Sequence, residues 1–200
     1  RLPIGSREVI ENAPHELFRK FYRTWYRPDL MAVIVVGDCD PPAMERLIRD
    51  TFSGAPVSSG QLSRAEFPVP DHEETLFAIA TDPEATRSGV SVYWKRPVRI
   101  EKTVGQYRRS IVEALFNSAL NRRLDELARM ADPPFLSAYS AIGDLVRTKE
   151  VYVLGAGVKD GGIERGLEAV LTEGARVARF GFTPAEITRE KADLLRAMEA

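Results

Sequence analysis

The stretch from Phe21 to Asp40, FYRTWYRPDLMAVIVVGDCD, most constrains what this chain can fold into. Its first residues are aromatic and basic at helical spacing, and Pro28 ends that helix because the residue before a proline disfavours helical geometry. Residues 31–36 are then apolar on both faces of an extended chain, as in the central strand of a sheet. Only one helix and a ten-residue lead precede them. We therefore expect the sheet partners of this strand to come from elsewhere, and this part to be the tail of a domain.

Residues 58–73 separate this first part from the rest of the chain. They contain prolines, serines and a glycine without a steady apolar period, which is typical of a linker between domains. We therefore expect the tail of a first domain over residues 1–57, a linker over residues 58–73, and a second, homologous domain over residues 74–200. The last helix still runs at Ala200 without a stop signal, so we expect the second domain to be truncated.

The second part alternates between strand and helix patterns. Period-two and β-branched runs predict strands, and apolar residues at spacings of three and four predict helices. In chain order we expect strands over residues 76–80 and 88–94, a helix over 103–131, strands over 135–145 and 151–158, and two more helices. The last helix begins with a capping box in which Thr183 is the cap, Pro184 follows, and Glu186 reaches back. This order predicts an α+β fold of two layers, with a mostly antiparallel sheet backed by helices.

The charge and hydropathy of the chain exclude several classes of function. Its net charge is −1, from 28 basic and 29 acidic residues, which gives no electrostatic reason to bind nucleic acid or a membrane surface. The longest apolar run covers residues 30–37, far short of the roughly 20 residues that span a bilayer. We therefore expect no nucleic-acid partner and no membrane span. The single Cys39 excludes an internal disulfide but does not fix the compartment.

The chain lacks a recognisable metal or nucleophile motif. His15 and His72 are its two histidines, and neither stands in an H-E-x-x-H or H-x-x-E-H pattern. No G-x-S-x-G or Walker sequence occurs, and Gly155-Ala156-Gly157 lies within a predicted strand, where it indicates a bend or a point of close packing. The pairs Arg108-Arg109 and Arg122-Arg123 could hold an acidic partner, but a solvated helix face is their simpler interpretation. We predict no catalytic residue and no metal ligand in this segment.

Three stretches nevertheless resemble the pitrilysin/insulinase family of zinc metallopeptidases. They are Leu2-Pro3-Ile4-Gly5, residues 25–31 with the sequence WYRPDLM, and residues 33–40 with the sequence VIVVGDCD. The resemblance implies a parent zinc-dependent endopeptidase built from repeated α+β domains. In that family an H-x-x-E-H helix and a downstream glutamate lie upstream of the Pro-Ile-Gly segment. The resemblance therefore implies zinc in the parent protein and none bound to this segment.

The same resemblance suggests two substrate-binding residues. Active members of the family are similar in an arginine and a tyrosine, late in a homologous second domain, that face the substrate near the zinc. Arg129 and Tyr139 are the nearest matches here, spaced more widely than in the family's pattern and separated by Pro133-Pro134. The resemblance therefore makes them candidate substrate-binding residues.

The functional expectation is a segment of a peptidase that helps to enclose a peptide or unfolded protein. Its partners would be a peptide substrate and the remaining domains of the parent chain, together with self-association through the strand between Ala32 and Val36. The resemblance suggests a bacterial periplasm or envelope. One alternative is a non-catalytic structural or processing-partner subunit of the same family. Another is a freestanding binding module without any link to a peptidase.

Overall fold

The computed structural model of the chain describes residues 5–55 and 65–199. Leu2, Pro3, Ile4 and the linker residues 58–64 lie outside the described residues, so the structural expectations for them stay predictions. The chain divides into two compact units, Arg1–Arg64 and Ala65–Ala200, called unit 1 and unit 2 below. The domain boundaries expected from the sequence remain a prediction about the intact protein.

Every element assigned within residues 5–55 of unit 1 is helical. The elements are α1 (Arg7–Asn12), α2 (His15–Trp25), the 3-10 helix η1 (Pro28–Leu30) and α3 (Pro41–Phe52). The Asp40 carboxylate accepts a hydrogen bond from the backbone N–H of Ala43 at 3.2 Å and so caps α3. Two prolines at its first positions fix the backbone in helical geometry.

The strand expected over residues 31–36 is not formed, so this prediction is wrong for the chain as it stands. A strand needs a neighbouring backbone to receive its hydrogen bonds, and the described part of unit 1 offers only helices. The apolar side chains of the segment consequently stay in solvent. Ile34 is 84% exposed and Val36 is 93% exposed.

Unit 2 contains an antiparallel sheet of three strands. These are β1 (Ser88–Arg96), β2 (Ser137–Val146) and β3 (Lys149–Val158), in the order β1-β3-β2. The register aligns Val92 with Leu154 and Tyr139 with Gly155. The further strand expected over residues 76–80 is wrong, because this stretch pairs with no neighbour in the described part of the chain and exposes Phe77 and Ile79.

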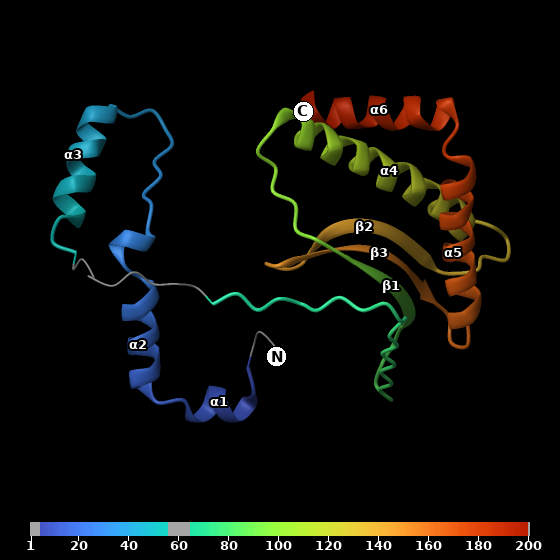
Figure 1. Cartoon of the computed structure of the whole chain (residues 1–200), viewed down its shortest axis with the longest axis horizontal. Coiled ribbons are helices and arrows are strands. Elements are labelled where there is room, and N and C mark those ends of the chain that lie inside the picture. The colour runs from blue at the N-terminus through green and yellow to red at the C-terminus, as the bar shows by residue number, and fades with distance from the viewer. Residues whose placement is uncertain (1–4, 56–64, 200) are drawn as a thin grey trace. The chain divides into compact units, whose positions relative to one another are not determined.

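Three helices accompany the sheet: α4 (Val104–Ala128), α5 (Ile163–Phe180) and α6 (Pro184–Glu199). Figure 1 shows α4 and α5 over one face of the sheet, with α6 lying against α4. The expected capping box of α6 is confirmed, since Glu186 accepts from the N–H of Thr183 at 2.7 Å and donates its own N–H to the Thr183 hydroxyl. Across the described residues, no helix is long and apolar enough to cross a membrane.

The hydrophobic core lies between the sheet and the helices α4 and α5. Its buried members come from α4, from the residues just before β2, from β3 and from α5: Leu120, Leu124, Phe135, Leu154, Ala156, Val158, Val170 and Val177. Side chains of β3 alternate, so the even-numbered residues enter this core and the odd-numbered ones point to the opposite, helix-free face. The expected α+β architecture, a mostly antiparallel sheet backed by helices, is confirmed.

Candidate functional site

Tyr139 lies on the helix-free face of the sheet, which we call the open face. Its neighbour Ser140 faces the helices, because its hydroxyl donates to the side chain of Asn117 on α4 at 2.6 Å. Because successive residues of a strand alternate, Tyr139 points the other way. Its side chain is 45% exposed, and its hydroxyl lies 3.2 Å from the hydroxyl of Ser91. A candidate substrate-binding residue is therefore held by a neighbour and accessible to a ligand.

A glycine in the central strand makes this arrangement possible. Tyr139 on β2 and Ser91 on β1 flank Gly155 on β3, and their hydroxyls meet across it. A Cβ atom at Gly155 would lie 2.6 Å from the Ser91 Oγ and 2.8 Å from the Tyr139 ring. These distances are shorter than van der Waals contact, so a residue with a Cβ would force the Ser91 hydroxyl and the Tyr139 ring to move. The close packing expected at Gly155 is confirmed.

The rest of the open face carries mostly small, uncharged side chains. Beyond Gly155, the next open-face row holds Gly89, Gly157 and Ser137 in register. In the opposite direction lie Tyr93 and Val153, followed by a row that includes Lys95. Such a surface offers backbone, hydroxyl groups and aromatic rings, which suit an extended peptide better than a charged metabolite.

Arg129 does not join Tyr139 on this surface. It is the exposed residue that ends α4, and its backbone N–H donates to the carbonyl oxygens of Glu126 and Leu127. The helix α4 packs against the face of the sheet opposite to Tyr139. Within residues 5–55 and 65–199, no hydrogen bond or ion pair connects the two side chains. Their shared substrate-binding role remains a prediction.

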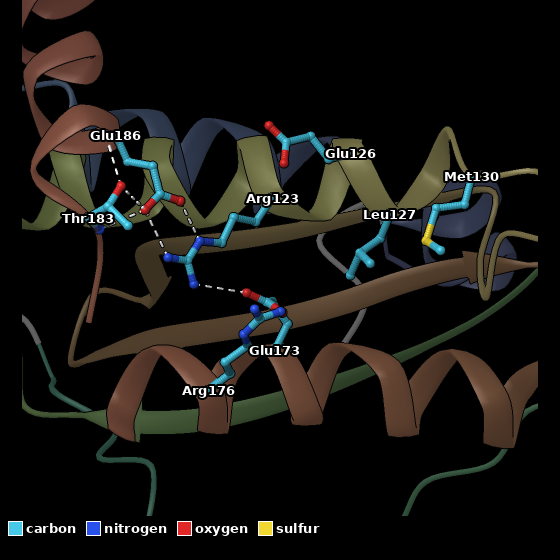
Figure 2. A pocket seen from close by; sticks show the side chains of 8 residues that line it. All are labelled: Arg123, Glu126, Leu127, Met130, Glu173, Arg176, Thr183 and Glu186. Carbon is cyan, nitrogen blue, oxygen red and sulfur yellow. Dashed lines mark hydrogen bonds and ion pairs between the residues drawn. The ribbon is translucent and has the colours of Figure 1, made fainter. Parts of the chain in front are cut away.

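Arg123 lies in a groove between α4, α5 and the start of α6 (Figure 2). Its Nε and Nη2 donate to the two carboxylate oxygens of Glu186 at 2.6 and 2.9 Å, and its Nη1 donates to Glu173 at 3.1 Å. The guanidinium carbon also lies 5.0 Å from the ring centroid of Phe182. The groove measures about 460 Å³ and is lined by Arg123, Glu126, Leu127, Met130, Glu173, Arg176, Thr183 and Glu186.

These ion pairs overturn the expectation that Arg122 and Arg123 face solvent. The Arg123 side chain is only 18% exposed, and the Nε of Arg122 donates to the buried Glu190 at 2.5 Å. The acidic partner of both arginines is therefore α5 or α6 of the same chain. The hydrogen bond from Arg123 lowers the pKa of Glu186 to about 2. Such a carboxylate stays ionised at neutral pH, so it fastens α6 to α4 and is poorly suited to proton transfer.

A second cluster of ion pairs surrounds Glu113 of α4. Arg99 donates through Nη1 and Nη2 to the two carboxylate oxygens of Glu113 at 2.6 and 2.7 Å, and its Nε donates to Glu150 at 3.2 Å. Arg96 adds a hydrogen bond to Glu113 at 3.1 Å. Together, with the bond from Arg99 as the larger cause, they lower the pKa of Glu113 to about 2. This cluster ties α4 to the loop after β1 and to β3.

The histidines and the cysteine lie apart from any metal-binding arrangement. His15 begins α2 and is exposed, and Cys39 is an exposed thiol in unit 1. A ring nitrogen of His72 lies 2.7 Å from the carbonyl oxygen of Glu74. Over residues 5–55 and 65–199, no three His, Cys, Asp or Glu side chains are placed to share a metal ion.

Sequence reasoning missed Ser91 and Arg123 as organising residues. The signal for Ser91 was the glycine within a strand pattern, which indicates a close neighbour but does not name it. The signal for Arg123 was weaker still, because its partners Glu173 and Glu186 are distant in the sequence and polar residues on a helix usually face solvent.

Comparison with known proteins identifies several relatives of the chain. A family model described as the peptidase M16 inactive domain matches residues 12–194. The chain is 41% identical over 147 residues to a zinc protease PQQL-like protein of Arabidopsis thaliana, covering 73% of this chain and 15% of that protein. It is 31% identical over 128 residues to the probable zinc protease PqqL of Escherichia coli (strain K12), covering 62% and 14%. The chain thus spans about a seventh of the length of these curated relatives.

Solved structures show the same fold. The crystal structure of the periplasmic protease PqqL from Escherichia coli superimposes with a TM-score of 0.82 at 22% identity, covering all of this chain and 22% of that one. The ferredoxin protease FusC, in complex with Arabidopsis ferredoxin, gives a TM-score of 0.69 at 25% identity, covering 96% and 21%. In both cases the chain corresponds to a part of a larger protein.

Proposed function

Because the chain belongs to the peptidase M16 family, we propose that it is a segment of a zinc-dependent metalloendopeptidase that builds the substrate chamber rather than the zinc site. The pitrilysin/insulinase family expected from the sequence is the one that these relatives represent, and that expectation is confirmed. The match of residues 12–194 to the family's inactive domain carries the proposal. The relatives' names as zinc proteases support the activity of the whole protein.

The zinc of such an enzyme would be held outside the residues described here. The family model that matches this chain describes an inactive domain. The His, Cys, Asp and Glu side chains of the described residues do not converge into a zinc site. Zinc in proteins is held by three or four converging His, Cys, Asp or Glu side chains. His15 and His72 lie in different units, and neither belongs to such a group in the described part of the chain.

The contribution of this segment would be to hold an extended peptide. The open face offers Tyr139 and the hydroxyl of Ser91, and β1 leaves one edge without a neighbouring strand in the described sheet, whereas the backbone of Ser140 at the edge of β2 is bonded to the side chain of Asn121. Peptides add to such edges through backbone hydrogen bonds. Arg129 and Tyr139 remain the proposed substrate-binding residues, and peptides or unfolded proteins are the proposed substrates. We also propose that the protein acts in the bacterial periplasm or envelope, since the Escherichia coli relative is described as a periplasmic protease.

Peptide cleavage by the intact protein tests this function. We expect hydrolysis of an unstructured fluorogenic peptide that stops with a zinc chelator and returns when zinc is added. We expect Tyr139→Phe and Arg129→Ala to raise KM several-fold while the zinc content stays unchanged. Leu171 lies on α5, which covers the face of the sheet opposite to Tyr139. Leu171→Ala therefore serves as a structural control. An intact protein that holds no zinc and cleaves no peptide would instead favour the alternative, a non-catalytic partner subunit.

A further inference from the structure

The outer edges of β1 and β2 differ in how they can receive another backbone. Asn121 of α4 covers the edge of β2 at Ser140. Its side-chain oxygen accepts from the backbone N–H of Ser140 at 2.6 Å, and its side-chain nitrogen donates to the carbonyl oxygen of the same residue at 3.0 Å. This two-point contact takes the place of a neighbouring strand, and Ser140 is only 2% exposed. A peptide therefore cannot pair with β2 at this point unless it displaces Asn121.

The same contact establishes which backbone groups of β1 face outward. Within an antiparallel sheet the N–H and C=O of one residue point the same way, and those of the next residue point the opposite way. Because Ser140 points away from β3, its partner Leu154 directs its backbone to Val92 on β1. Ser91 and Tyr93, on either side of Val92, therefore direct their N–H and C=O groups away from the sheet. Across residues 5–55 and 65–199, no backbone hydrogen bond from outside the sheet reaches these two residues.

Two adjacent aromatic residues flank this outward-facing backbone. Tyr93 lies on the open face and is 56% exposed, whereas Trp94 lies on the face that carries the helices and is 42% exposed. The Trp94 ring packs on its inner side against the ring of Tyr152, with a centroid distance of 5.4 Å. A strand added to β1 would place two consecutive side chains beside Tyr93 and Trp94, one on each face of the sheet.

The polar side chains at the two ends of β1 are already engaged. Lys95 donates to the carbonyl oxygen of Pro70, and Arg96 donates to Glu113 at 3.1 Å. At the other end, the Ser88 hydroxyl donates to the Asp160 carboxylate at 3.0 Å. Residues 89–94 between them have the uncharged sequence GVSVYW. This edge therefore offers backbone hydrogen bonds and aromatic rings, rather than charge, to a ligand.

We propose that the outer edge of β1 binds an extended peptide through two adjacent large apolar residues, one beside Tyr93 and one beside Trp94, while Asn121 keeps such peptides off β2. This inference rests on the proposed function, and it names the class of substrate and the edge with which it pairs. Large apolar residues are mostly buried in folded proteins and become accessible when a protein unfolds. The edge of β1 therefore selects unfolded segments over folded surfaces.

Amide hydrogen exchange of the 200-residue chain, resolved by residue with NMR, tests this inference. The probe is a threonine-rich decapeptide with a central Phe-Leu pair, and the matched probe carries Ser-Thr instead. The chain carries Ile34→Lys, so that the exposed apolar residues 31–36 do not compete for the edge. At saturating Phe-Leu peptide, exchange at Ser91 and Tyr93 should slow about tenfold or more, and exchange at Ser140 should stay unchanged. The Ser-Thr peptide should bind about threefold or more weakly.

Two substitutions at one position separate the backbone from the side chain. Tyr93→Pro removes an outward N–H, and an edge strand tolerates proline where that N–H faces solvent. Tyr93→Thr removes the ring but keeps the N–H, so it is the matched control. We expect Tyr93→Pro to abolish the protection of Ser91 by the peptide, and Tyr93→Thr to retain it with weaker binding. In Asn121→Ala, the peptide should protect Ser140 as well. Circular dichroism of each variant establishes that unit 2 remains folded.

Several results would overturn the proposal. One is the absence of peptide binding, or binding that leaves Ser91 and Tyr93 unprotected. Another is equal binding by Tyr93→Pro and Tyr93→Thr. A third is protection of Ser91 and Tyr93 in the peptide-free chain that disappears in Phe77→Asp, because residues 76–80 of the same chain would then fill the edge. Zinc-dependent cleavage by the intact protein is measured separately, so each of these results leaves the proposed function standing.

Discussion

Arg123 and Glu186 form a two-point ion pair, with Nε–Oε1 and Nη2–Oε2 distances of 2.6 and 2.9 Å, that joins the C-terminal part of α4 to the first turn of α6. Glu186 simultaneously completes the capping box with Thr183. One carboxylate therefore starts α6 and fastens it. The attachment of α6 depends on a few charged groups more than on a continuous apolar seam.

Replacing Arg123 by alanine should loosen α6. The change leaves Glu173 and Glu186 without their main cation, and removal of one partner from a mostly covered pair is costly. We expect the free energy of unfolding to fall by about 2–4 kcal/mol in urea titrations. Arg129→Ala, an exposed arginine at the end of the same helix, should cost about 0.5 kcal/mol or less. Equal losses in the two variants would contradict a fastening role for Arg123.

Stability should fall in acid because of Glu113 and Glu186. Each has a folded-state pKa of about 2 against an ordinary value of 4.5. A lowered carboxyl pKa contributes stability that is complete above about 4.5 and disappears as the pH falls toward 2, since the unfolded chain takes up protons first. We expect unfolding midpoints in urea to decrease from pH 6 to pH 3.

Glutamine variants isolate these two groups. Glu186→Gln keeps the capping geometry, because glutamine also serves in a capping box, while it removes the charge. We expect each variant to lose on the order of 1–2 kcal/mol at pH 7 and to show a flatter dependence on pH. A slope identical to that of the parent protein would rule out these carboxylates as its source.

Gly155→Ala should disturb the open face. The added Cβ would clash with the Ser91 hydroxyl and the Tyr139 ring, and overpacking of this kind costs about 1–3 kcal/mol. Gly143→Ala on β2 is the control, since a Cβ there meets nothing within 4 Å. In a Tyr139→Ala background the cost of Gly155→Ala should shrink. A double-mutant cycle by chemical unfolding measures this coupling, and a coupling of zero would show that Tyr139 does not depend on Gly155.

The apolar segment between Ala32 and Val36 should drive self-association of the isolated chain. Ile34 and Val36 are highly exposed, and an unpaired apolar extended segment recruits another backbone. Sedimentation velocity should show mass increasing with protein concentration, and Ile34→Lys should restore the monomer. Val104→Lys, an equally exposed apolar residue on α4, should not restore it. A monomer at every concentration would contradict this prediction.

Much of unit 2 could be predicted from the sequence because its signals are local. The capping box of α6 needs only Thr183 and Glu186, and the alternation of β1 and the long apolar stripe of α4 need only their own residues. The expected strand at residues 31–36 depended instead on a neighbour that local pattern cannot supply. Its hydrophobicity was recognised, but pairing is a property of two segments.

The candidate site was harder to predict, because its geometry arises between distant residues. Gly155 indicated a close approach, yet only the register of the sheet places Ser91 and Tyr139 on either side of it. The choice of Arg129 rested on family resemblance, and the alternation of β2 together with the position of α4 puts it away from Tyr139. Arg123 resembled any solvated helix arginine until α5 and α6 were folded against it.

The zinc content of two purified proteins, measured by elemental analysis, tests the central claim most directly. One is the intact protein of which these residues would be a segment, and the other is the 200-residue chain alone. We predict about one zinc per molecule in the intact protein, with peptide cleavage, and neither zinc nor cleavage in the chain alone. One tightly bound zinc per 200-residue chain, or an intact protein without zinc, would contradict the account.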